Sequence, residues 1–300
     1  MNARSLNIEN LRILSQIFSS ATFKKIIKEK DPKAYYTILE SFFKIEGAIN
    51  ITNKDIIRVA YKQLLKRYRC EYIYKNIIFE SIIRQYGLQD TVTYNEFDIS
   101  SSKADILLLN GIIRVYEIKT ELDDLTRLYD QLQNYQKIAD EVYIVSHEHC
   151  IPKLINEYSK TNFGIIKLTS NNCLEIVQKA KNNRLFFNYD TIFKVLRKSE
   201  YLYLTTKLLG FVHNVPNTQV FRRCYESLKI VDLITFQKEV LQVLKARKTQ
   251  PIKLLNSRKT PKELRYICNS LALNNNEYDQ LFNFLNQNVY VSTLHQRQTK

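Results

Sequence analysis

Apolar residues recur every three or four positions between about residues 8 and 87, and this spacing predicts helices. In one such segment Ile56, Val59, Ala60 and Leu64 fall on a single stripe, with Lys62 between them. Glycine and proline number only five each, which favours long helices over a β-sandwich. From about residue 185 onward the same spacing predicts four further helices, at 190–209, 219–246, 260–272 and 276–287.

The middle of the chain has a different pattern. Residues 91–97 are β-branched and aromatic, which is typical of a strand. Two apolar runs, 104–110 and 111–119, meet at Asn110-Gly111, and that dipeptide between apolar runs is a strong hairpin signal. After the hairpin the pattern predicts a helix, a strand, a second helix and a second strand, at 123–138, 141–146, about 151–160 and about 163–168. The sequence therefore predicts an α/β (α+β) fold.

The order of elements suggests three regions. We expect an N-terminal helical region at 1–50, a core that holds the strands at 51–180, and a basic helical region at 181–300. After residue 180 there are 20 Lys and Arg against 8 Asp and Glu, so most of the net charge of +15 lies there. Such an excess indicates a polyanionic partner, of which nucleic acid is the commonest.

Cysteine usage and hydropathy bear on the compartment. The five cysteines are widely spaced and include no CxxC pair, a pattern typical of reduced thiols in a cytosol. No segment resembles a signal peptide or approaches the ~18 apolar residues that span a bilayer. We expect a cytoplasmic protein without a membrane partner.

Three charged residues stand out in the apolar hairpin. Asp105 lies early in the first strand, and Glu117 and Lys119 lie near the end of the second. Alternation along a strand places Glu117 and Lys119 on one face. Charged residues in such strands are paired, bound to a ligand or exposed.

The face of Asp105 depends on the hairpin register. If Asn110-Gly111 forms the whole loop, Asp105 pairs with Tyr116 and lies on the face opposite to Glu117. If the loop also includes Leu109, Asp105 faces Val115 and is the diagonal neighbour of Glu117. A shared site needs the second register or a bulge elsewhere.

The residue types fit metal-assisted chemistry. Two carboxylates on one face can hold Mg²⁺ through oxygen, and a nearby lysine can orient a water or offset charge on a phosphate. The alternative is a surface hairpin in which Asp105, Glu117 and Lys119 form ordinary ion pairs.

The hairpin resembles the (P)D…(D/E)xK signature of restriction-endonuclease-like nucleases. Eleven residues separate Asp105 from Glu117-Ile118-Lys119, and Ala104 replaces the proline. Gln131 and Tyr135 resemble the QxxxY motif of some branches. The strings 116–128 and 196–200 resemble a largely uncharacterised bacterial family of this superfamily, so that the resemblance extends over roughly residues 55–250.

The resemblance implies a core with a small mixed sheet flanked by helices, and a Mg²⁺- or Mn²⁺-dependent nuclease. Asp105 and Glu117 would be metal ligands, Lys119 the water-orienting or charge-stabilising group, and Gln131 and Tyr135 supporting residues. Superfamily members often use one more acidic residue. Here Glu96 is favoured over Glu80 and the more distant Glu71. The resemblance also implies DNA as substrate in preference to RNA, a bacterial setting in restriction, phage defence or repair, and a homodimer.

The densest basic stretch lies near residue 250. Its side chains would bind phosphates without reading sequence. The residues we expect to contact nucleic acid are Lys245, Arg247, Lys248, Arg258 and Lys259. Two other functions stay open, a non-catalytic nucleic-acid-binding protein on the same fold and a helical partner-binding protein whose hairpin charges are structural.

Overall fold

The computed structural model describes residues 8–42, 51–248 and 250–289. The chain forms two compact units. Unit 1 joins Met1–Gln85 to Gln250–Lys300, and unit 2 is Tyr86–Thr249. The expected boundary at residue 50 lies outside the described residues. No boundary occurs near residue 180, because residues on both sides of it share one apolar core in unit 2.

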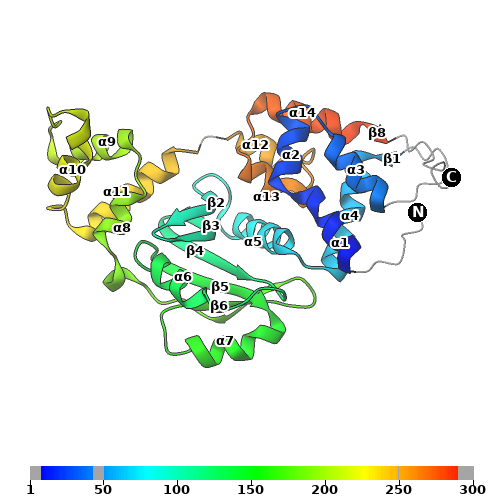
Figure 1. Cartoon of the computed structure of the whole chain (residues 1–300), viewed down its shortest axis with the longest axis horizontal. Helices are drawn as coiled ribbons and strands as arrows, with labels where there is room; N and C mark the ends of the chain where they lie inside the picture. The colour runs from blue at the N-terminus through cyan, green and yellow to red at the C-terminus, as the bar shows by residue number, and fades with distance from the viewer. Residues whose placement is uncertain (1–7, 43–50, 249, 290–300) are drawn as a thin grey trace, which may run out of the picture. The chain divides into compact units, whose positions relative to one another are not determined.

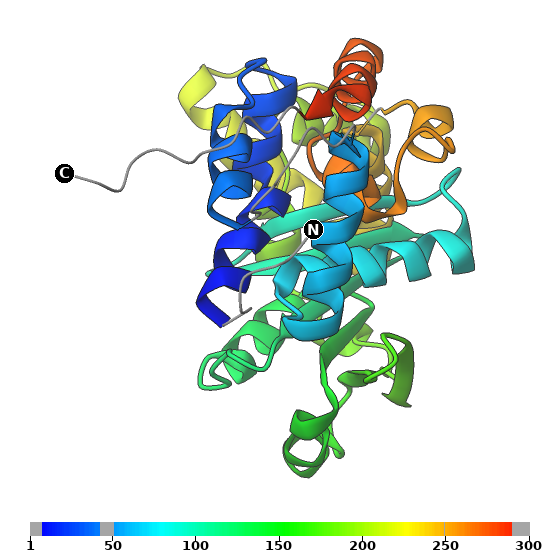
Figure 2. The ribbon, with the colours of Figure 1, turned by 90° about the vertical axis from the view of Figure 1, so that its right-hand side faces the viewer.

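Unit 1 is helical and is built from both ends of the sequence. The short strands β1 and β8 pair antiparallel, with Ile51 opposite Val289, and α14 packs on α2 and α4 (Figures 1 and 2). Neither short strand was expected from the sequence. The described elements are α1 (Ile8–Ser15), α2 (Ser20–Ile27), α3 (Lys33–Phe42), β1 (Ile51–Thr52), α4 (Asn53–Arg67), α5 (Glu71–Tyr86, whose last residue begins unit 2), α12 (Ile252–Leu255), α13 (Arg265–Ser270), α14 (Asn275–Asn286) and β8 (Asn288–Val289).

Unit 2 contains a six-stranded sheet with the strand order β2-β3-β4-β5-β6-β7. Strand β3 pairs antiparallel with both β2 and β4, strand β5 pairs parallel with both β4 and β6, and β7 is antiparallel to β6. The sheet is therefore mixed, and the expected α+β class is confirmed. The strands are β2 (Val92–Ile99), β3 (Ser102–Asn110), β4 (Ile112–Lys119), β5 (Glu141–His147), β6 (Gly164–Leu168) and β7 (Leu174–Gln178).

Helices join the parallel strands, as parallel pairing requires. Helix α6 (Leu128–Tyr135) connects β4 to β5 and packs on β3, and α7 (Ile151–Tyr158) connects β5 to β6 and packs on β6 (Figure 1). The helix expected at 123–138 begins only at Leu128. The reason is local, because the side chains of Asp123 and Asp124 accept hydrogen bonds from the backbone at Thr120 and Thr126 and hold turns there.

Four helices follow the sheet in unit 2. The expected helix at 190–209 divides into α8 (Tyr189–Lys194) and α9 (Lys198–Leu209). The one at 219–246 divides into α10 (Asn217–Leu228) and α11 (Leu233–Ala246). The second division has a clear cause, since the Asp232 carboxylate accepts from Thr235 N at 2.9 Å and caps a new helix.

Helix α11 is tied to the sheet by a buried carboxylate. Asp140 is 3% exposed, and its Oδ2 accepts from Ile113 N at 2.9 Å and from Gln237 Nε2 at 3.0 Å. Buried carboxylates need such donors, because an unpaired one costs several kcal/mol by order of magnitude. Asp140 thus sets the position of α11 against β4. None of the described helices is long and apolar enough to cross a bilayer.

Candidate active site

The hairpin register brings Asp105 and Glu117 together. Asn110 pairs directly with Ile112, so that Gly111 alone connects the strands, at a φ of +68° that glycine adopts without strain. Neither of the two registers expected from the sequence occurs. The observed ladder runs to the pair of Ile106 and Tyr116, and one further step places Asp105 opposite Glu117. Opposed residues of antiparallel strands share a face, so both carboxylates belong to one side of the sheet.

Glu117 and Lys119 form a buried ion pair. Their residues are 2% and 9% exposed, and Lys119 Nζ lies 2.9 Å from Glu117 Oε1. Lys119 Nζ also donates to Gln131 Oε1 at 2.9 Å. The Tyr135 hydroxyl lies 2.9 Å from Glu117 Oε2. The structure therefore gathers the two strand residues and both expected α6 residues into one cluster.

Backbone contacts fix the orientation of this cluster. The Asp105 carboxylate accepts from Ile118 N at 2.7 Å, and Asp105 is half-buried. The Ser146 hydroxyl of β5 donates to Lys119 O at 2.7 Å, and Lys103 O lies 2.8 Å from the Tyr135 hydroxyl. Ser146 was not expected from the sequence, although a polar residue near the end of an otherwise apolar strand was a signal for it.

Burial opposes ionisation of the acidic side chains in this cluster. Burial raises the pKa of Glu117 above its ordinary value, and this shift is opposed by the Lys119 charge and by the hydrogen bonds of Lys119, Tyr135 and Gln131. Burial and the charges of Glu117 and Asp105 raise the pKa of Tyr135 far above its ordinary value. Tyr135 therefore stays protonated at neutral pH and can donate a hydrogen bond.

Glu96 of strand β2 lies in the same cross-strand row as Asp105 of β3 and Glu117 of β4. Asn95 pairs with Ile106 and Phe97 with Ala104, so the register sets Glu96 against Asp105. Glu96 is exposed and has a φ of +52°, an unusual conformation for a residue other than glycine within a strand. The register thus aligns Glu96, Asp105 and Glu117 across β2, β3 and β4.

The alternative acidic residues lie in unit 1, where each has a basic partner. The Glu80 carboxylate pairs with Arg265 at 3.3 Å. Glu71 pairs with Lys75 one helical turn away. Neither carboxylate belongs to the sheet that carries Asp105 and Glu117.

The donor set fits a hard divalent cation. Within the described ranges, no three or more Asp, Glu, His or Cys side chains are gathered closely enough to hold a metal. Mg²⁺ does not need such a cage, since it commonly takes one or two carboxylates and completes its shell with water and substrate phosphate. Asp105 and Glu117 supply two adjacent carboxylates, and each carboxylate oxygen can accept from more than one partner. These two residues would hold the ion, with Glu96 next in the row.

The expected nucleic-acid-binding residues are divided between the units. Arg258 and Lys259 are exposed in unit 1. Lys245, Arg247 and Lys248 follow one another closely in unit 2, where Arg247 pairs with Glu200 and donates to Val195 O. Arg247 thus links α11 to the start of α9.

Lys248 lies against strand β2. Its Nζ donates to Thr93 O at 2.8 Å and lies 5.8 Å from the ring centroid of Tyr94. Burial lowers the pKa of Lys248 to about 7. At neutral pH its charge is therefore partly lost, which weakens its expected role as a phosphate ligand.

This lowered pKa predicts that alkaline pH stabilises unit 2. Between pH 7 and the ordinary lysine pKa, the unfolded chain binds a proton that the folded chain releases, so the free energy of unfolding rises with pH. Between pH 7 and pH 9, the free energy of unfolding should rise more in wild type than in Lys248→Met, by at most about 2 kcal/mol. Urea unfolding at both pH values measures it, with Lys245→Met as control. Equal pH dependence of wild type and Lys248→Met would contradict the expectation.

Comparisons of the sequence and the structure show which known proteins this chain is similar to. A family model described as bacteriophage P4 protein cII matches residues 65–268. The protein cII of Enterobacteria phage P4 is 31% identical over 115 residues, which are 36% of this chain and 42% of that protein. The chain thus spans less than half the length of this curated relative.

A solved structure is also similar to part of this chain. A protein of unknown function from Silicibacter pomeroyi is 16% identical and covers 45% of this chain and 92% of its own, with a TM-score of 0.29. A TM-score this low carries no argument about fold or function.

Proposed function

The chain belongs to the family of bacteriophage P4 protein cII, and we propose that this member is a metal-dependent nuclease that hydrolyses phosphodiester bonds in DNA. The observation that carries the proposal is the buried pair of Glu117 and Lys119 with Asp105 beside it. Burying an ion pair usually costs more than it gains relative to apolar packing. Perturbed groups of this kind concentrate at functional sites, and here they have the residue types that phosphoryl chemistry needs.

We propose a role for each side chain that is consistent with its contacts. Asp105 and Glu117 would hold Mg²⁺ or Mn²⁺. The hydrogen bond from Ile118 N fixes the orientation of the Asp105 carboxylate. When bound, the cation would supply Lewis acidity and positive charge at the scissile phosphate. Lys119 orients the attacking water or offsets charge that develops on the phosphate. Gln131 and Tyr135 hold the Lys119 ammonium and the Glu117 carboxylate in place.

A purely structural ion pair is the competing interpretation. It explains the contact between Glu117 and Lys119, but it gives no reason for a second carboxylate on the adjacent strand in the same row. The nuclease interpretation accounts for Asp105, Glu117 and Lys119 together. The choice of DNA over RNA, action as a homodimer and a role in restriction, phage defence or repair rest on the superfamily resemblance alone.

Incubation of the purified protein with supercoiled plasmid and linear duplex DNA tests the function. We expect cleavage with Mg²⁺ or Mn²⁺ and none with EDTA, and nicked circles would show internal cutting. A parallel RNA substrate tests the preference for DNA. If the protein retards DNA in a gel but does not cleave it, the alternative function is favoured, that of a nucleic-acid-binding protein without catalysis.

A further inference from the structure

Charge is distributed unevenly within unit 2. Residues 86–180, which include the sheet, carry 9 Lys and Arg against 14 Asp and Glu. Residues 181–249, which include α8 to α11, carry 13 against 5. A nuclease whose catalytic sheet is acidic needs a separate basic surface to hold a polyanion. Within unit 2, the helices after the sheet provide it.

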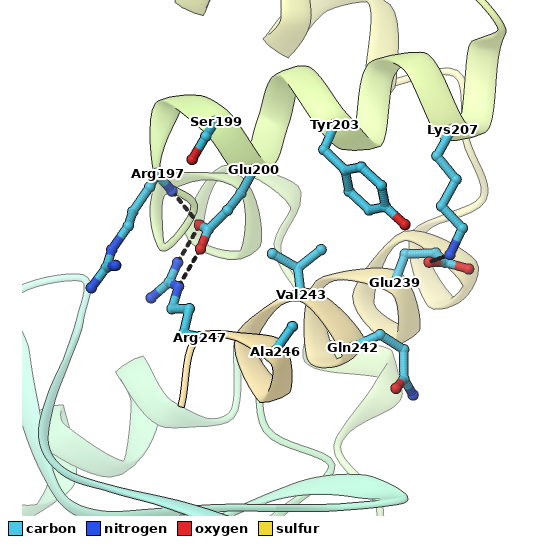
Figure 3. Close-up of a pocket in the computed structure, with 10 residues that line it drawn as sticks. All are labelled: Arg197, Ser199, Glu200, Tyr203, Lys207, Glu239, Gln242, Val243, Ala246 and Arg247. Atoms are coloured by element: carbon cyan, nitrogen blue, oxygen red, sulfur yellow. Dashed lines mark hydrogen bonds and ion pairs between the residues drawn. The ribbon is translucent and has the colours of Figure 1, made fainter. Parts of the chain in front are cut away.

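A pocket of about 460 Å³ lies between α9 and α11 of this basic region (Figure 3). Tyr203 points from α9 toward α11, where Val243 lies beneath it and Ala246 lies farther along the floor. Tyr203 is 55% exposed although its ring lines a pocket. The volume falls in the usual range for pockets that bind small organic molecules, which is roughly 300–1,000 Å³.

Ion pairs brace both ends of the pocket. Arg247 binds Glu200 at one end, and Lys207 binds Glu239 at the other (Figure 3). Both acidic side chains are thereby neutralised, so the walls present no uncompensated negative charge. Arg197 is exposed beside the first pair and forms no ion pair among the described residues. The pocket therefore carries an excess positive charge at its Arg197 end.

These features suit a flat, apolar-faced ligand that carries a negative charge at one side. An aromatic ring above an apolar surface stacks on nucleobases, and an arginine at the end of the same pocket can bind a phosphate. In a duplex the base faces are covered by their neighbours, whereas the bases of a single strand are free to stack on protein.

We propose that the pocket between α9 and α11 binds one unpaired nucleotide of a single-stranded nucleic acid, with the base stacked on Tyr203 and a phosphate on Arg197. This inference rests on the proposed nuclease function, to which it adds a contact for an unpaired segment of the substrate. Arg222 and Arg223 line a second, smaller pocket on α10. Both arginines also pair with Glu226 of the same helix, and we expect the rest of the strand to contact this part of the basic region.

The test is binding in the presence of EDTA, so that cleavage plays no part. Fluorescence anisotropy compares a labelled 12-residue oligothymidylate with a labelled duplex of the same length. For Tyr203→Ala we expect about a tenfold weaker affinity for the single strand, because stacking on an aromatic ring contributes roughly that factor or more. Tyr203→Phe keeps the ring and should bind within about twofold of wild type.

Two further variants refine the test. Arg197→Gln should reduce the salt dependence of single-strand binding by about one phosphate contact, a change of about 0.7 in the logarithmic slope. Phe186→Ala removes an aromatic ring that is 46% exposed outside the pocket and should bind as wild type does. Thermal melting confirms that each variant is folded, and the exposure of Tyr203 makes unfolding by its replacement a minor concern.

The outcomes separate this inference from the proposed function. Wild-type affinity in Tyr203→Ala, or an equal loss for single strand and duplex, overturns the pocket as a single-strand site. Failure of wild type to bind the oligothymidylate overturns it as well. Metal-dependent plasmid cleavage in the same preparation would leave the nuclease proposal standing in each of these cases.

Discussion

Replacing Lys119 by methionine is expected to lower the rate of DNA cleavage by about 10²- to 10³-fold, because it removes a positive charge preorganised beside the scissile phosphate. Methionine is unbranched like lysine and keeps most of the length and volume of the side chain. The initial rate of plasmid nicking at saturating Mg²⁺ measures the effect. Binding of the substrate in EDTA should change much less, since the lost interaction matters most in the transition state.

The matched control is Lys167→Met. Lys167 lies on strand β6 of the same sheet, and its ammonium pairs with Glu175 at 2.7 Å. Its replacement removes an ion pair of a strand lysine but touches none of the proposed active-site residues. Retained cleavage in Lys119→Met, together with normal cleavage in the control, would show that the Glu117–Lys119 pair is structural.

Replacing Glu117 by glutamine is expected to abolish the stabilisation of the protein by divalent cations. A ligand that binds only the folded chain raises its stability, by about 2.7 kcal/mol at a concentration of 100 times Kd. For a unit of this size that stabilisation raises Tm by several degrees. Wild type should therefore melt higher in Mn²⁺ than in EDTA. Glu117→Gln should melt at the same temperature in both, because it has lost a charged ligand.

Glu141→Gln is the control for this measurement. Glu141 lies on β5 and pairs with Arg114 at 2.7 Å, so its replacement also breaks a strand ion pair. It should lower Tm in both buffers and leave the response to Mn²⁺ intact. A Mn²⁺ shift that survives in Glu117→Gln would remove Glu117 from the metal site. Calorimetric titration of Mn²⁺ supplies a second readout that does not depend on cleavage.

The hairpin could be located from the sequence, but its register could not. Asn110-Gly111 separates two apolar runs, and the structure confirms a strand on each side of it. The sequence suggested loops of two or three residues, whereas Gly111 alone makes the connection. Its positive φ allows a shorter turn than the usual hairpin types, and only the three-dimensional ladder shows this. The position of Asp105 depends on that single residue.

The sequence predicted which residues belong to the cluster around Glu117, but it could not predict the contacts between them. Spacing alone places Glu117 and Lys119 on one face, because side chains alternate along a strand. The contacts of Gln131 and Tyr135 depend on where α6 begins and on how it packs over β3, and local turns at Asp123 and Asp124 moved that start. Long-range packing also decides which basic residues are exposed, as the link from Arg247 to Glu200 illustrates.

Unit 1 is interrupted by unit 2 in the sequence, and this has a consequence for biosynthesis. A ribosome completes Tyr86–Thr249 before it adds Gln250–Lys300, so unit 2 can fold while unit 1 still lacks its second segment. At common rates of translation the delay is roughly 3 to 10 s. During that interval α2 and α4 lack their partner α14. The nascent chain can thus form the hairpin of Asp105, Glu117 and Lys119 early, and it exposes the apolar faces of α2 and α4 until α14 has been made.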